Sequence, residues 1–562
     1  MKVEWMREIK KGESISKEKI IEILLKNRNI KDKQGFLNPP SPLSIQLSYF
    51  GFKKELHDFI SLLTVIKNKK QRIVVYTDYD ADGITGGTIM WETLYLLGFD
   101  VMPYVPHRKH EGYGFSEKGI DRVKKEFDPA LIISVDHGIS GTNEITYAAS
   151  LGIQIVVTDH HLAPEKKPDK AHAIFHIPAL SGSGVAYFVA KEIYTSFKSI
   201  LKTNDKRLST YFEVDYLVLA AIGTIADLIP LTGPSRSIVY HGLHAFKKTK
   251  RTGIKHIISE AKITDKAITP YEVGFIIAPR INAVGRLEHA LDALRLLCTH
   301  NDKQAKEIAS KIGGTNKERQ DLVTDAVKEA KQMVEKIVEK DNLPLIILLH
   351  STRWNEGIIG LIASKIAETY SRPTIVLTKS DGFWKGSARS VNDFHITEFL
   401  RSMEKRLISV GGHKGAAGFS IVDSELDGFR ELTQKQIKKI AKEKDFEKTI
   451  IADMKIPLSL ATSDLAKELE KLAPFGVGNP NPSFVSEVTI LEKKTFGKKG
   501  EHIKFFVKDT HAESFPIELI AFYKAEEYKK IIKGNQISAV YCLDINRWNG
   551  RESLRGKILQ IY

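Results

Sequence analysis

Short apolar runs alternate with helical stretches between about residues 72 and 300. The apolar runs are rich in β-branched residues and cover 73–76, 131–135 and 153–157. Stretches of helical character, such as 88–98 and 115–126, separate them. Strands that alternate with helices typically form parallel βαβ units. The pattern therefore predicts a parallel α/β domain over residues 51–300, preceded by an N-terminal extension over residues 1–50.

Residues 301–341 are rich in Lys, Glu, Gln and Ala and predict one long helix. Its apolar positions recur at alternating steps of four and three, which places them on one helical face. These positions are Val323, Val327, Ala330, Val334 and Ile337. A charged outer face suits a connector between domains, and a helix within a bundle is the alternative.

The chain after this helix predicts two further domains. Residues 342–445 repeat the α/β pattern, with strands at 345–349 and 374–377, a helix at 358–369 and a surface helix at 425–445. Residues 446–562 change to short alternating strands separated by turn residues, which is typical of a small all-β barrel or sandwich. The expected fold is a multidomain α/β protein with a C-terminal all-β domain.

Composition narrows the partners of such a protein. The 562 residues carry a formal net charge of +15, which favours a polyanionic partner, either nucleic acid or an anionic membrane surface. Cys298 and Cys542 lie far apart in sequence and offer neither a disulfide framework nor a thiolate metal site. The N-terminus lacks the apolar segment of a signal peptide, and no apolar run reaches the roughly 18–20 residues that span a bilayer. We expect a soluble, cytoplasmic protein.

Three carboxylates follow the first predicted strand at alternate positions, at Asp78, Asp80 and Asp82. Neighbouring carboxylates repel one another unless positive charge neutralises them, and Mg²⁺ or Mn²⁺ prefers such oxygen ligands. Active sites also collect at strand ends in parallel sheets. An acidic turn exposed to water is the plainer alternative. A calcium-binding loop is another, but the rest of the EF-hand spacing is absent.

An apolar strand followed by Asp or His recurs along the chain. The residues concerned are Asp136, His137, Asp159, His160, His161 and, in a fourth segment, Asp227. Because the ends of parallel strands lie on one edge of a sheet, we expect these side chains to form a single site. An Asp/His set without Cys suits Mn²⁺ or Mg²⁺ better than structural zinc. Two such ions can bridge a phosphate and activate water for in-line attack, so the pattern predicts a phosphoesterase.

The four clusters resemble the motifs of the DHH phosphoesterase superfamily, and within it the chain resembles the RecJ family of bacterial single-strand-specific exonucleases. The likeness extends from about residue 70 to the C-terminus. Further motifs follow in the same order, at 106–108, 112–114, 278–283, 285–287, 316–320, 357–360, 385–389, 411–413 and 474–480. Their order and number make the resemblance specific.

The resemblance implies two Mn²⁺ or Mg²⁺ ions with five ligands, which are Asp80, Asp82, Asp136, His160 and Asp227. It also implies catalytic roles for Asp78, Asp136 and His161, with Asp78 orienting ligands or water and His161 near the scissile phosphate. The implied substrate-binding residues are Arg108, Tyr113, Arg280, Asn282, Ser387, Arg389, Gly412 and His413. Glycines let backbone N–H groups approach a phosphate, and arginine supplies a fork of donors. A tight turn is the plainer interpretation of residues 411–413.

The resemblance further implies that residues 342–445 form a DHH-associated substrate-binding domain and that residues 446–562 form an OB-fold. OB-folds bind single strands through a basic groove and stacking aromatics. The basic and aromatic residues that could play these two roles are Lys493, Lys494, Lys498, Lys499, Lys504, Phe505 and Phe506. Because Phe505 and Phe506 are adjacent in a predicted strand, only one can face a groove, and the sequence leaves open which.

The implied function is a 5′→3′ exonuclease that degrades single-stranded DNA to 5′-mononucleotides, with a role in DNA repair and recombination. The implied partners are a helicase and a single-strand-binding protein, and the implied state is a monomer. The alternatives are a DHH phosphoesterase acting on short RNA oligonucleotides or cyclic dinucleotides, a pyrophosphatase, and a catalytically inactive scaffold. His137 and Asn355 depart from the family pattern, so the sequence leaves their roles open.

Overall fold

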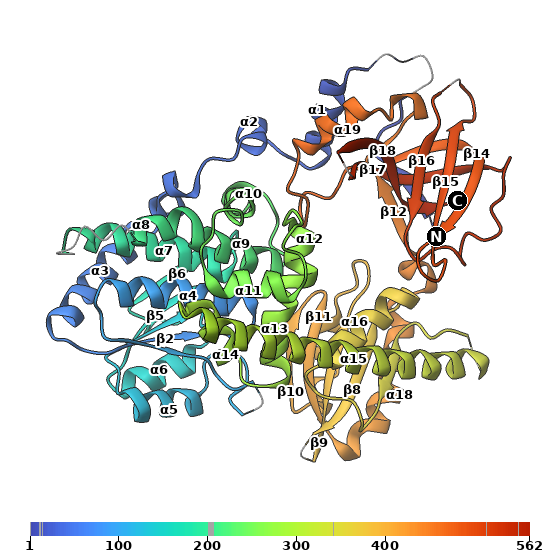
Figure 1. The fold of residues 1–562 in the computed structure, drawn as a ribbon. Helices are drawn as coiled ribbons and strands as arrows, with labels where there is room; N and C mark the ends of the chain where they lie inside the picture. The colour runs from blue at the N-terminus through green and yellow to red at the C-terminus, as the bar shows by residue number, and fades with distance from the viewer. Residues whose placement is uncertain are drawn as a thin grey trace. The chain divides into compact units, whose positions relative to one another are not determined.

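The computed structural model divides into two compact units, and Figure 1 labels their elements. It describes residues 2–9, 13, 15–108, 110–200, 207–340, 342–380, 382–512, 514–548 and 550–562. The larger unit contains Val3–Gly285, Ala290–Ser310 and Ile451–Tyr562. The smaller unit contains Arg286–His289 and Lys311–Ile450.

A five-stranded sheet of order β3-β2-β4-β5-β6 forms the centre of the larger unit. Its strands are β2 (Ile73–Thr77), β3 (Val101–Tyr104), β4 (Leu131–Val135), β5 (Gln154–Asp159) and β6 (Ala173–His176). The described pairings between them are parallel. β2 and β4 are buried along their whole length, which explains why they appear as continuous apolar runs in the sequence. The predicted parallel α/β domain is confirmed.

Helices cover both faces of this sheet. On one face, α5 (Glu117–Phe127) and α6 (Thr142–Ser150) pack against side chains of β2 and β4, Val74 and Ile132 among them. On the other face, Gly86 and Gly87 of α4 (Ala81–Leu96) lie against Val135 and Thr77. α7 (Gly182–Phe197) and α9 (Tyr216–Ala226) pack beside α4. The helix predicted at 88–98 thus begins earlier, because Asp80 caps it with hydrogen bonds from the backbone N–H groups of Asp82 and Gly83.

Further helices complete the larger unit. They are α1 (Lys17–Asn27), α2 (Lys33–Leu37), α3 (Lys53–Asn68), α8 (Arg207–Thr210), α10 (Gly233–Ala245), α11 (Thr252–Glu260), α12 (Pro270–Glu272), the π-helical η5 (Val273–Ile277), α13 (Ala278–Leu287) and α14 (Leu291–Cys298). One described helical stretch, Arg207–Ala226, is long and apolar enough to cross a membrane, with a mean hydropathy of 1.3. Because 72% of its apolar part is buried inside the protein, this stretch is explained as a core helix.

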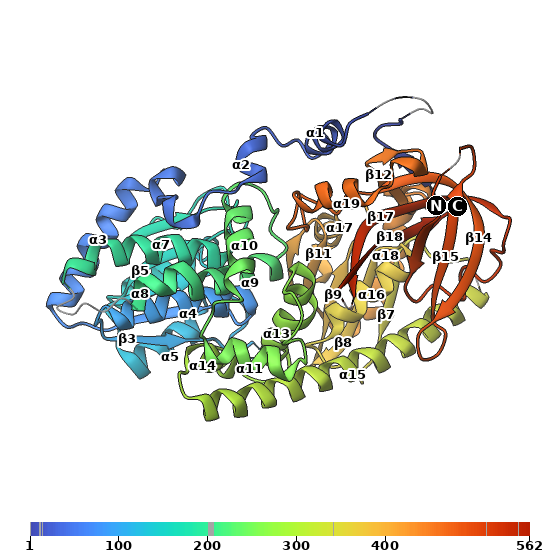
Figure 2. The same cartoon turned by 45° about the horizontal axis from the view of Figure 1, so that its top comes forward.

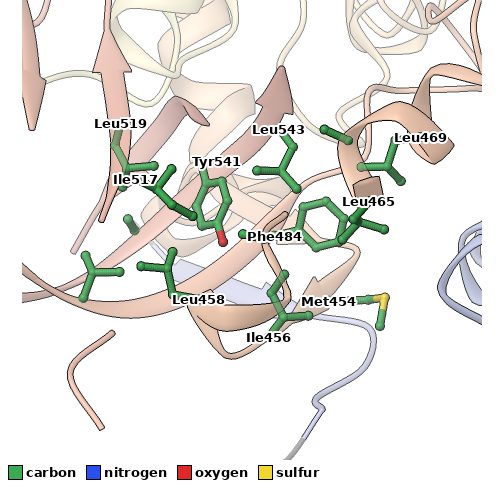
Figure 3. Close-up of a cluster of buried hydrophobic side chains, with 14 of the residues drawn as sticks. Met454, Ile456, Leu458, Leu465, Leu469, Phe484, Ile517, Leu519, Tyr541 and Leu543 are labelled. Carbon is green, nitrogen blue, oxygen red and sulfur yellow. The ribbon is translucent and has the colours of Figure 1, made fainter. Parts of the chain in front are cut away.

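The C-terminal part of the larger unit is a closed β-barrel. β14 (Phe484–Phe496), β15 (His502–Asp509), β16 (Ile517–Ala521), β18 (Arg551–Ile561) and β17 (Gln536–Trp548) pair in that order. β17 also pairs with β14, which closes the sheet. Figure 3 shows Phe484, Leu519, Tyr541 and other apolar side chains gathered inside it, together with Leu465 and Leu469 of α19 (Ser463–Glu470). The prediction of an all-β domain is confirmed.

The barrel core includes residues from the other end of the chain. Ile20, Ile21, Leu24 and Leu25 of α1 and Phe36 of α2 belong to the same buried cluster as Phe484 and Tyr541. Figures 1 and 2 draw α1 in blue near the orange α19. The segment before residue 50, which the sequence indicated only as an extension, therefore supplies part of this core.

A buried arginine joins three segments of the larger unit. Arg236 of α10 is 1% exposed, and its guanidinium donates hydrogen bonds to the carbonyl oxygens of Phe36, Leu472, Ala473 and Pro474. The same group lies 3.7 Å from the centre of the Phe36 ring. One side chain thereby connects α10, the end of α2 and the loop that precedes β14.

We expect Arg236→Lys to lower the free energy of unfolding by about 2–4 kcal/mol, because buried carbonyl groups lose their donors and a lysine cannot reproduce the planar fork. Denaturant unfolding of the full chain measures the change. The matched control is Arg295→Lys, since Arg295 makes an exposed ion pair with Asp292 and should cost less than about 1 kcal/mol. Equal stability of the two variants would contradict the prediction.

The smaller unit has a mixed sheet of order β10-β11-β9-β8-β7. Its strands are β7 (Ile347–His350), β8 (Thr374–Ser380), β9 (Phe383–Arg389), β10 (Ser409–His413) and β11 (Ala416–Val422). β7 and β8 pair in parallel, whereas the other described pairings are antiparallel. α17 (Ile396–Arg401) and α18 (Leu426–Ile440) pack on one face. α16 (Ile359–Tyr370) and α15 (Asp302–Lys340) pack on the other.

The long helix α15 uses the apolar face that the sequence predicted. Ala330 and Val334 are buried against α16 and the sheet, and Val323, Val327 and Ile337 pack against the same cluster. Position 341, where the sequence placed the end of the helix, lies outside the described residues.

Candidate metal centre

The Asp/His clusters meet at the carboxyl edge of the parallel sheet. Asp78 follows β2, Asp136 follows β4, and Asp159 ends β5 with His160 and His161 directly after it. Asp227 arrives from a different direction, at the C-terminal end of α9. Four segments that are distant in sequence therefore contribute to one site.

His160 lies at the centre of this group. Its Nε2 atom is 3.1 Å from Asp136 Oδ1, 3.4 Å from Asp227 Oδ2 and 3.8 Å from Asp82 Oδ2. Among the described residues, neither His160 Nε2 nor Asp136 Oδ1 has a hydrogen-bond partner, although both atoms are buried, and the same is true of Asp78 Oδ1. Buried polar atoms without partners are rare in native proteins and mark a place for an ion or water.

The carboxylates of the cluster destabilise one another. Burial, followed by repulsion from neighbouring carboxylates, raises the pKa values of Asp78, Asp80 and Asp136. The same two causes raise the pKa of Asp227 to about 8. A buried group of negative charges of this kind requires compensating positive charge.

The donor set fits divalent cations. Three groups have ligand atoms that all lie within 4.8 Å of one another: Asp78, Asp80 and Asp136; Asp82, His160 and Asp227; and Asp136, His160 and His161. Carboxylate oxygens with a few imidazole nitrogens suit Mn²⁺ or Mg²⁺. Asp136 and His160 each belong to two of these three groups.

Two helix N-termini hold the carboxylates in place. Asp80 caps α4, and Asp82 accepts hydrogen bonds from the N–H groups of Gly182 (2.6 Å) and Ser183 (2.9 Å) at the start of α7. Helix N-termini favour negative charge because their N–H groups are unpaired and their dipoles point outward. The two helices therefore fix carboxylates that would otherwise move apart.

Glycines permit the close approach of these segments. A Cβ atom on Gly182 would lie 2.4 Å from Asp136 Oδ1, and one on Gly223 of α9 would lie 2.2 Å from Asp82 Oδ1. Asp136 itself adopts a left-handed backbone conformation, with φ of 69°, which is costly for a residue other than glycine and clusters at functional sites. The backbone as well as the side chains is thus arranged around the cluster.

Asp159 orients His161 rather than joining the cluster. Asp159 accepts hydrogen bonds from three backbone N–H groups and from His161 Nδ1 at 2.8 Å. Although burial opposes ionisation, these contacts hold the pKa of Asp159 well below its usual range. Burial would lower the pKa of His161, but the hydrogen bond and charge of Asp159 raise it to about 9. His161 is therefore held as a cation beside the cluster.

Two further contacts surround His161. The hydroxyl of Tyr113 lies 3.0 Å from His161 Nε2 and donates to the carbonyl oxygen of Asp136 at 3.2 Å. His176, at the end of β6, donates from Nε2 to the carbonyl oxygen of His161 at 2.7 Å. Sequence reasoning missed His176, although its place at a strand end was an available signal.

His137 faces away from the cluster. It is 1% exposed, its Nε2 donates to the carbonyl oxygen of Tyr76, and its ring packs edge-on against Tyr76 and Phe115. Burial lowers the pKa of His137 to about 4, which keeps it neutral. Of the two roles left open by the sequence, extra ligand or bystander, these contacts favour the bystander.

The predicted substrate-binding residues of the larger unit differ in their surroundings. The Arg108 guanidinium lies 5.3 Å from the centre of the Tyr79 ring. Tyr79 stands between Asp78 and Asp80 in the sequence. Asn282 accepts a hydrogen bond from the N–H of Ala81 at 2.7 Å, so it supports the start of α4. Arg280 donates to Glu260 at 2.6 Å and to the carbonyl oxygen of Ile276. Among the described contacts, none joins Arg280 to the cluster.

The remaining predicted residues lie together in the smaller unit. Ser387 and Arg389 are two residues apart on β9, and the Arg389 guanidinium donates to the hydroxyl oxygens of Ser387 and Ser364. Strand register places Ala416 beside both Arg389 and His413, and Gly418 beside Ser387 and Gly411. A Cβ atom on Gly411 or Gly418 would meet no described atom within 4 Å. One face of the sheet thus combines small residues with an arginine and a histidine.

Two positions in the smaller unit have local backbone roles. Gly412 has a φ of 144°, and a Cβ atom there would lie 2.3 Å from the carbonyl oxygen of Ala416. Asn355 accepts a hydrogen bond from the N–H of Gly357 at 2.7 Å, so it stabilises the turn before α16.

Three family models match the chain. They are the DHH family N-terminal domain over residues 72–224, the DHHA1 domain over 342–439 and the RecJ OB domain over 452–560. The single-stranded-DNA-specific exonuclease RecJ of Thermus thermophilus is 30% identical over 506 residues, which cover 88% of this chain and 69% of that protein. The chain belongs to the RecJ family.

Other members of the RecJ family extend the likeness. The single-stranded-DNA-specific exonuclease RecJ of Bacillus subtilis is 34% identical over 497 residues, which cover 86% of this chain. The chain spans 60% of the length of that relative. A crystal structure of RecJ in complex with Mn²⁺ from Thermus thermophilus matches with a TM-score of 0.79 at 26% identity, over 100% of this chain and 80% of that one. The predicted combination of DHH, DHH-associated and OB-fold domains is confirmed.

Proposed function

We propose that this RecJ-family chain is a metal-dependent exonuclease that degrades single-stranded DNA from the 5′ end to 5′-mononucleotides. The observation that carries the proposal is the buried Asp/His cluster, in which His160 Nε2, Asp136 Oδ1 and Asp78 Oδ1 lack hydrogen-bond partners within the described part of the chain. Relatives that are named single-stranded-DNA-specific exonucleases support the substrate. A role in DNA repair and recombination follows from that activity.

We infer that two Mn²⁺ or Mg²⁺ ions bind the cluster. Asp80, Asp82, Asp136, His160 and Asp227 would hold them, and Asp78, whose Oδ1 is buried beside Asp80 and Asp136, would orient ligands or water. Bound divalent ions would polarise phosphate oxygens and lower the pKa of a water molecule. The Mn²⁺-bound Thermus thermophilus relative supports this choice of metal.

His161 is suited to proton transfer in this reaction. Because its Nδ1–H is directed at Asp159, the second proton of the imidazolium is on Nε2. The Tyr113 hydroxyl lies 3.0 Å from Nε2, so a substrate oxygen would have to take the place of that hydroxyl to receive the proton. The raised pKa of His161 keeps that proton in place at neutral pH. An imidazolium in this position can donate to a phosphate oxygen or to the departing 3′-oxygen.

Two further surfaces offer contacts to a nucleic-acid strand. In the smaller unit, Ser387, Arg389 and His413 provide donors around an open glycine row, which suits phosphate groups. In the barrel, Phe505 is fully buried in the core. Phe506 is half-buried, and the centre of its ring lies 5.8 Å from Lys494 Nζ and 5.5 Å from Lys504 Nζ. Phe506 is therefore the member of the pair that is available for a base.

A polarity assay on the full chain tests the proposal. With Mn²⁺ or Mg²⁺, we expect mononucleotides from a single strand that is blocked at its 3′ end, no products from one blocked at its 5′ end, and no reaction in EDTA. A blunt duplex of the same sequence should be degraded at least tenfold more slowly. Equal degradation of duplex and single strand, or digestion from the 3′ end, would overturn the assignment.

The alternative substrates are short RNA oligonucleotides and cyclic dinucleotides. The C-terminal barrel does not favour them, because a single-strand-binding domain adds nothing to the recognition of a dinucleotide. If the protein hydrolysed dinucleotides faster than a long single strand, the alternative substrates would be favoured instead. We expect a helicase and a single-strand-binding protein as partners, because a helicase generates unpaired DNA and a single-strand-binding protein keeps it unpaired. We retain a cytoplasmic monomer as the expected form.

A further inference from the structure

Two aromatic side chains are exposed on a helix that lies against the metal centre. Tyr271 of α12 is 61% exposed and Phe275 of η5 is 70% exposed. Their rings are stacked, with centroids 5.0 Å apart and planes 29° apart. Large exposed rings cost free energy in water, so a stacked pair of them indicates a binding surface.

The helix that carries this pair lies close to two of the segments that bear cluster residues. A Cβ atom on Gly274 would lie 3.6 Å from Ile225, which is two residues before Asp227. Further along, Asn282 accepts a hydrogen bond from Ala81, between Asp80 and Asp82. Phe275 thus directly follows Gly274, which lies close to the last turn of α9, the helix that ends at Asp227.

Helix geometry gives the scale of the arrangement. With a rise of about 1.5 Å per residue in an α-helix and less in the π-helical η5, Phe275 lies at most about 10 Å and Tyr271 at most about 16 Å along the axis from Asn282. Leu228, directly after Asp227, is also exposed, at 69%. Along the helix axis, the aromatic pair therefore lies within about 10–16 Å of the residue that supports the Asp80–Asp82 turn.

We propose that Tyr271 and Phe275 form a stacking site for unpaired bases of the substrate strand, next to the metal centre. Flat, exposed rings bind bases of any sequence because every base has a π-face. Paired bases in a duplex offer no free face to such a site, so the pair would also contribute to single-strand selectivity. This inference rests on the proposed nuclease function and identifies residues that position its substrate.

Abasic substrates test the proposal in the full chain. We expect the wild-type kcat/KM for a 5′-phosphorylated single strand to fall about tenfold when an abasic unit occupies the stacked position, which is found by moving the unit along the strand. Phe275→Ala should lose about the same factor on the normal strand and nothing further on the abasic strand. Phe275→Leu, which keeps an apolar side chain but no ring face, should behave like alanine, and Phe275→Trp should restore the wild-type value.

A matched control is available on α4. Trp91 and Tyr95 form a similar stacked pair at the far end of that helix, with centroids 5.2 Å apart, and Tyr95 is 57% exposed. Tyr95→Ala should leave kcat/KM unchanged. If Phe275→Ala instead lowers activity by the same factor on normal and abasic strands, or equals wild type on both, the stacking site is wrong.

A binding measurement separates this inference from the proposed activity. A strand with 2-aminopurine at the stacked position should lose fluorescence on binding to wild type in EDTA, and should keep it with the Tyr271→Ala/Phe275→Ala double variant. This result requires no hydrolysis. Quenching without nuclease activity would overturn only the proposed function, whereas activity with equal quenching in both proteins would overturn only the stacking site.

Discussion

Replacing Asp136 by alanine should lower the hydrolysis of single-stranded DNA by about a thousandfold or more. Asp136 contributes to two of the three groups of potential ligands among the described residues, and its buried Oδ1 lies 3.1 Å from His160 Nε2. Its removal would disturb both proposed ion positions at once. Initial rates on a 5′-labelled strand over a range of Mn²⁺ concentrations measure the loss.

The loss of activity should occur without unfolding. Because burial and neighbouring carboxylates raise the pKa of Asp136, its removal relieves repulsion, and the melting temperature in EDTA should not fall. Mn²⁺ should raise the melting temperature of wild type, since an ion that binds the folded state stabilises it, and should raise that of the variant much less. Asp265→Ala removes an exposed carboxylate and serves as the control. Retained activity in Asp136→Ala would refute the role of the cluster.

Gly223→Ala should inactivate the protein although glycine has no chemistry of its own. The added Cβ would lie 2.2 Å from Asp82 Oδ1 and 2.1 Å from Ser183 Oγ, so either α9 or the Asp82 carboxylate must move. We expect a loss of about 1–3 kcal/mol in the free energy of unfolding and about a hundredfold loss of activity, because small displacements of catalytic groups are costly.

The control for this substitution is another helical glycine. Gly314 of α15 has no described atom within 4 Å of its Cβ position, so Gly314→Ala should stabilise the protein by roughly 0.5–1 kcal/mol and leave hydrolysis unchanged. Thermal unfolding and initial rates of the two variants can be compared directly. Similar behaviour of both glycine variants would mean that the close approach at Asp82 is unimportant.

The position of the cluster could be predicted from the sequence because it depends on local signals. Each apolar run ends in Asp or His, and parallel strands bring such ends to one edge. The same alternation predicted the α/β domain, and the four-three spacing of Val323, Val327 and Ala330 predicted the buried face of α15. These features can be predicted from the spacing of apolar residues along the sequence, without knowledge of contacts between distant segments.

Other parts of the site depend on tertiary contacts that no local pattern carries. The backbone donors of Gly182 and Ser183 to Asp82 arise where α4 meets α7, a hundred residues apart in sequence. The pairing of Arg280 with Glu260 depends on how α11 and α13 pack. The early start of α4, in contrast, is set by a local signal, the capping side chain of Asp80, which the helix predicted at 88–98 left out. His137 shares the sequence signal of the ligands, yet its backbone direction turns it into the core.

The barrel core, which α1 and α2 complete, has a consequence for the order of synthesis. Leu24 and Phe36 are made several hundred residues before Phe484 and Tyr541, with which they share a buried cluster. The apolar side chains of α1 and α2 therefore lack these partners until the barrel strands have been made, and contacts of such long sequence separation form slowly. A fragment that contains the β-strands alone would lack part of its own interior, so the C-terminal barrel is not a module that can be separated from the beginning of the chain.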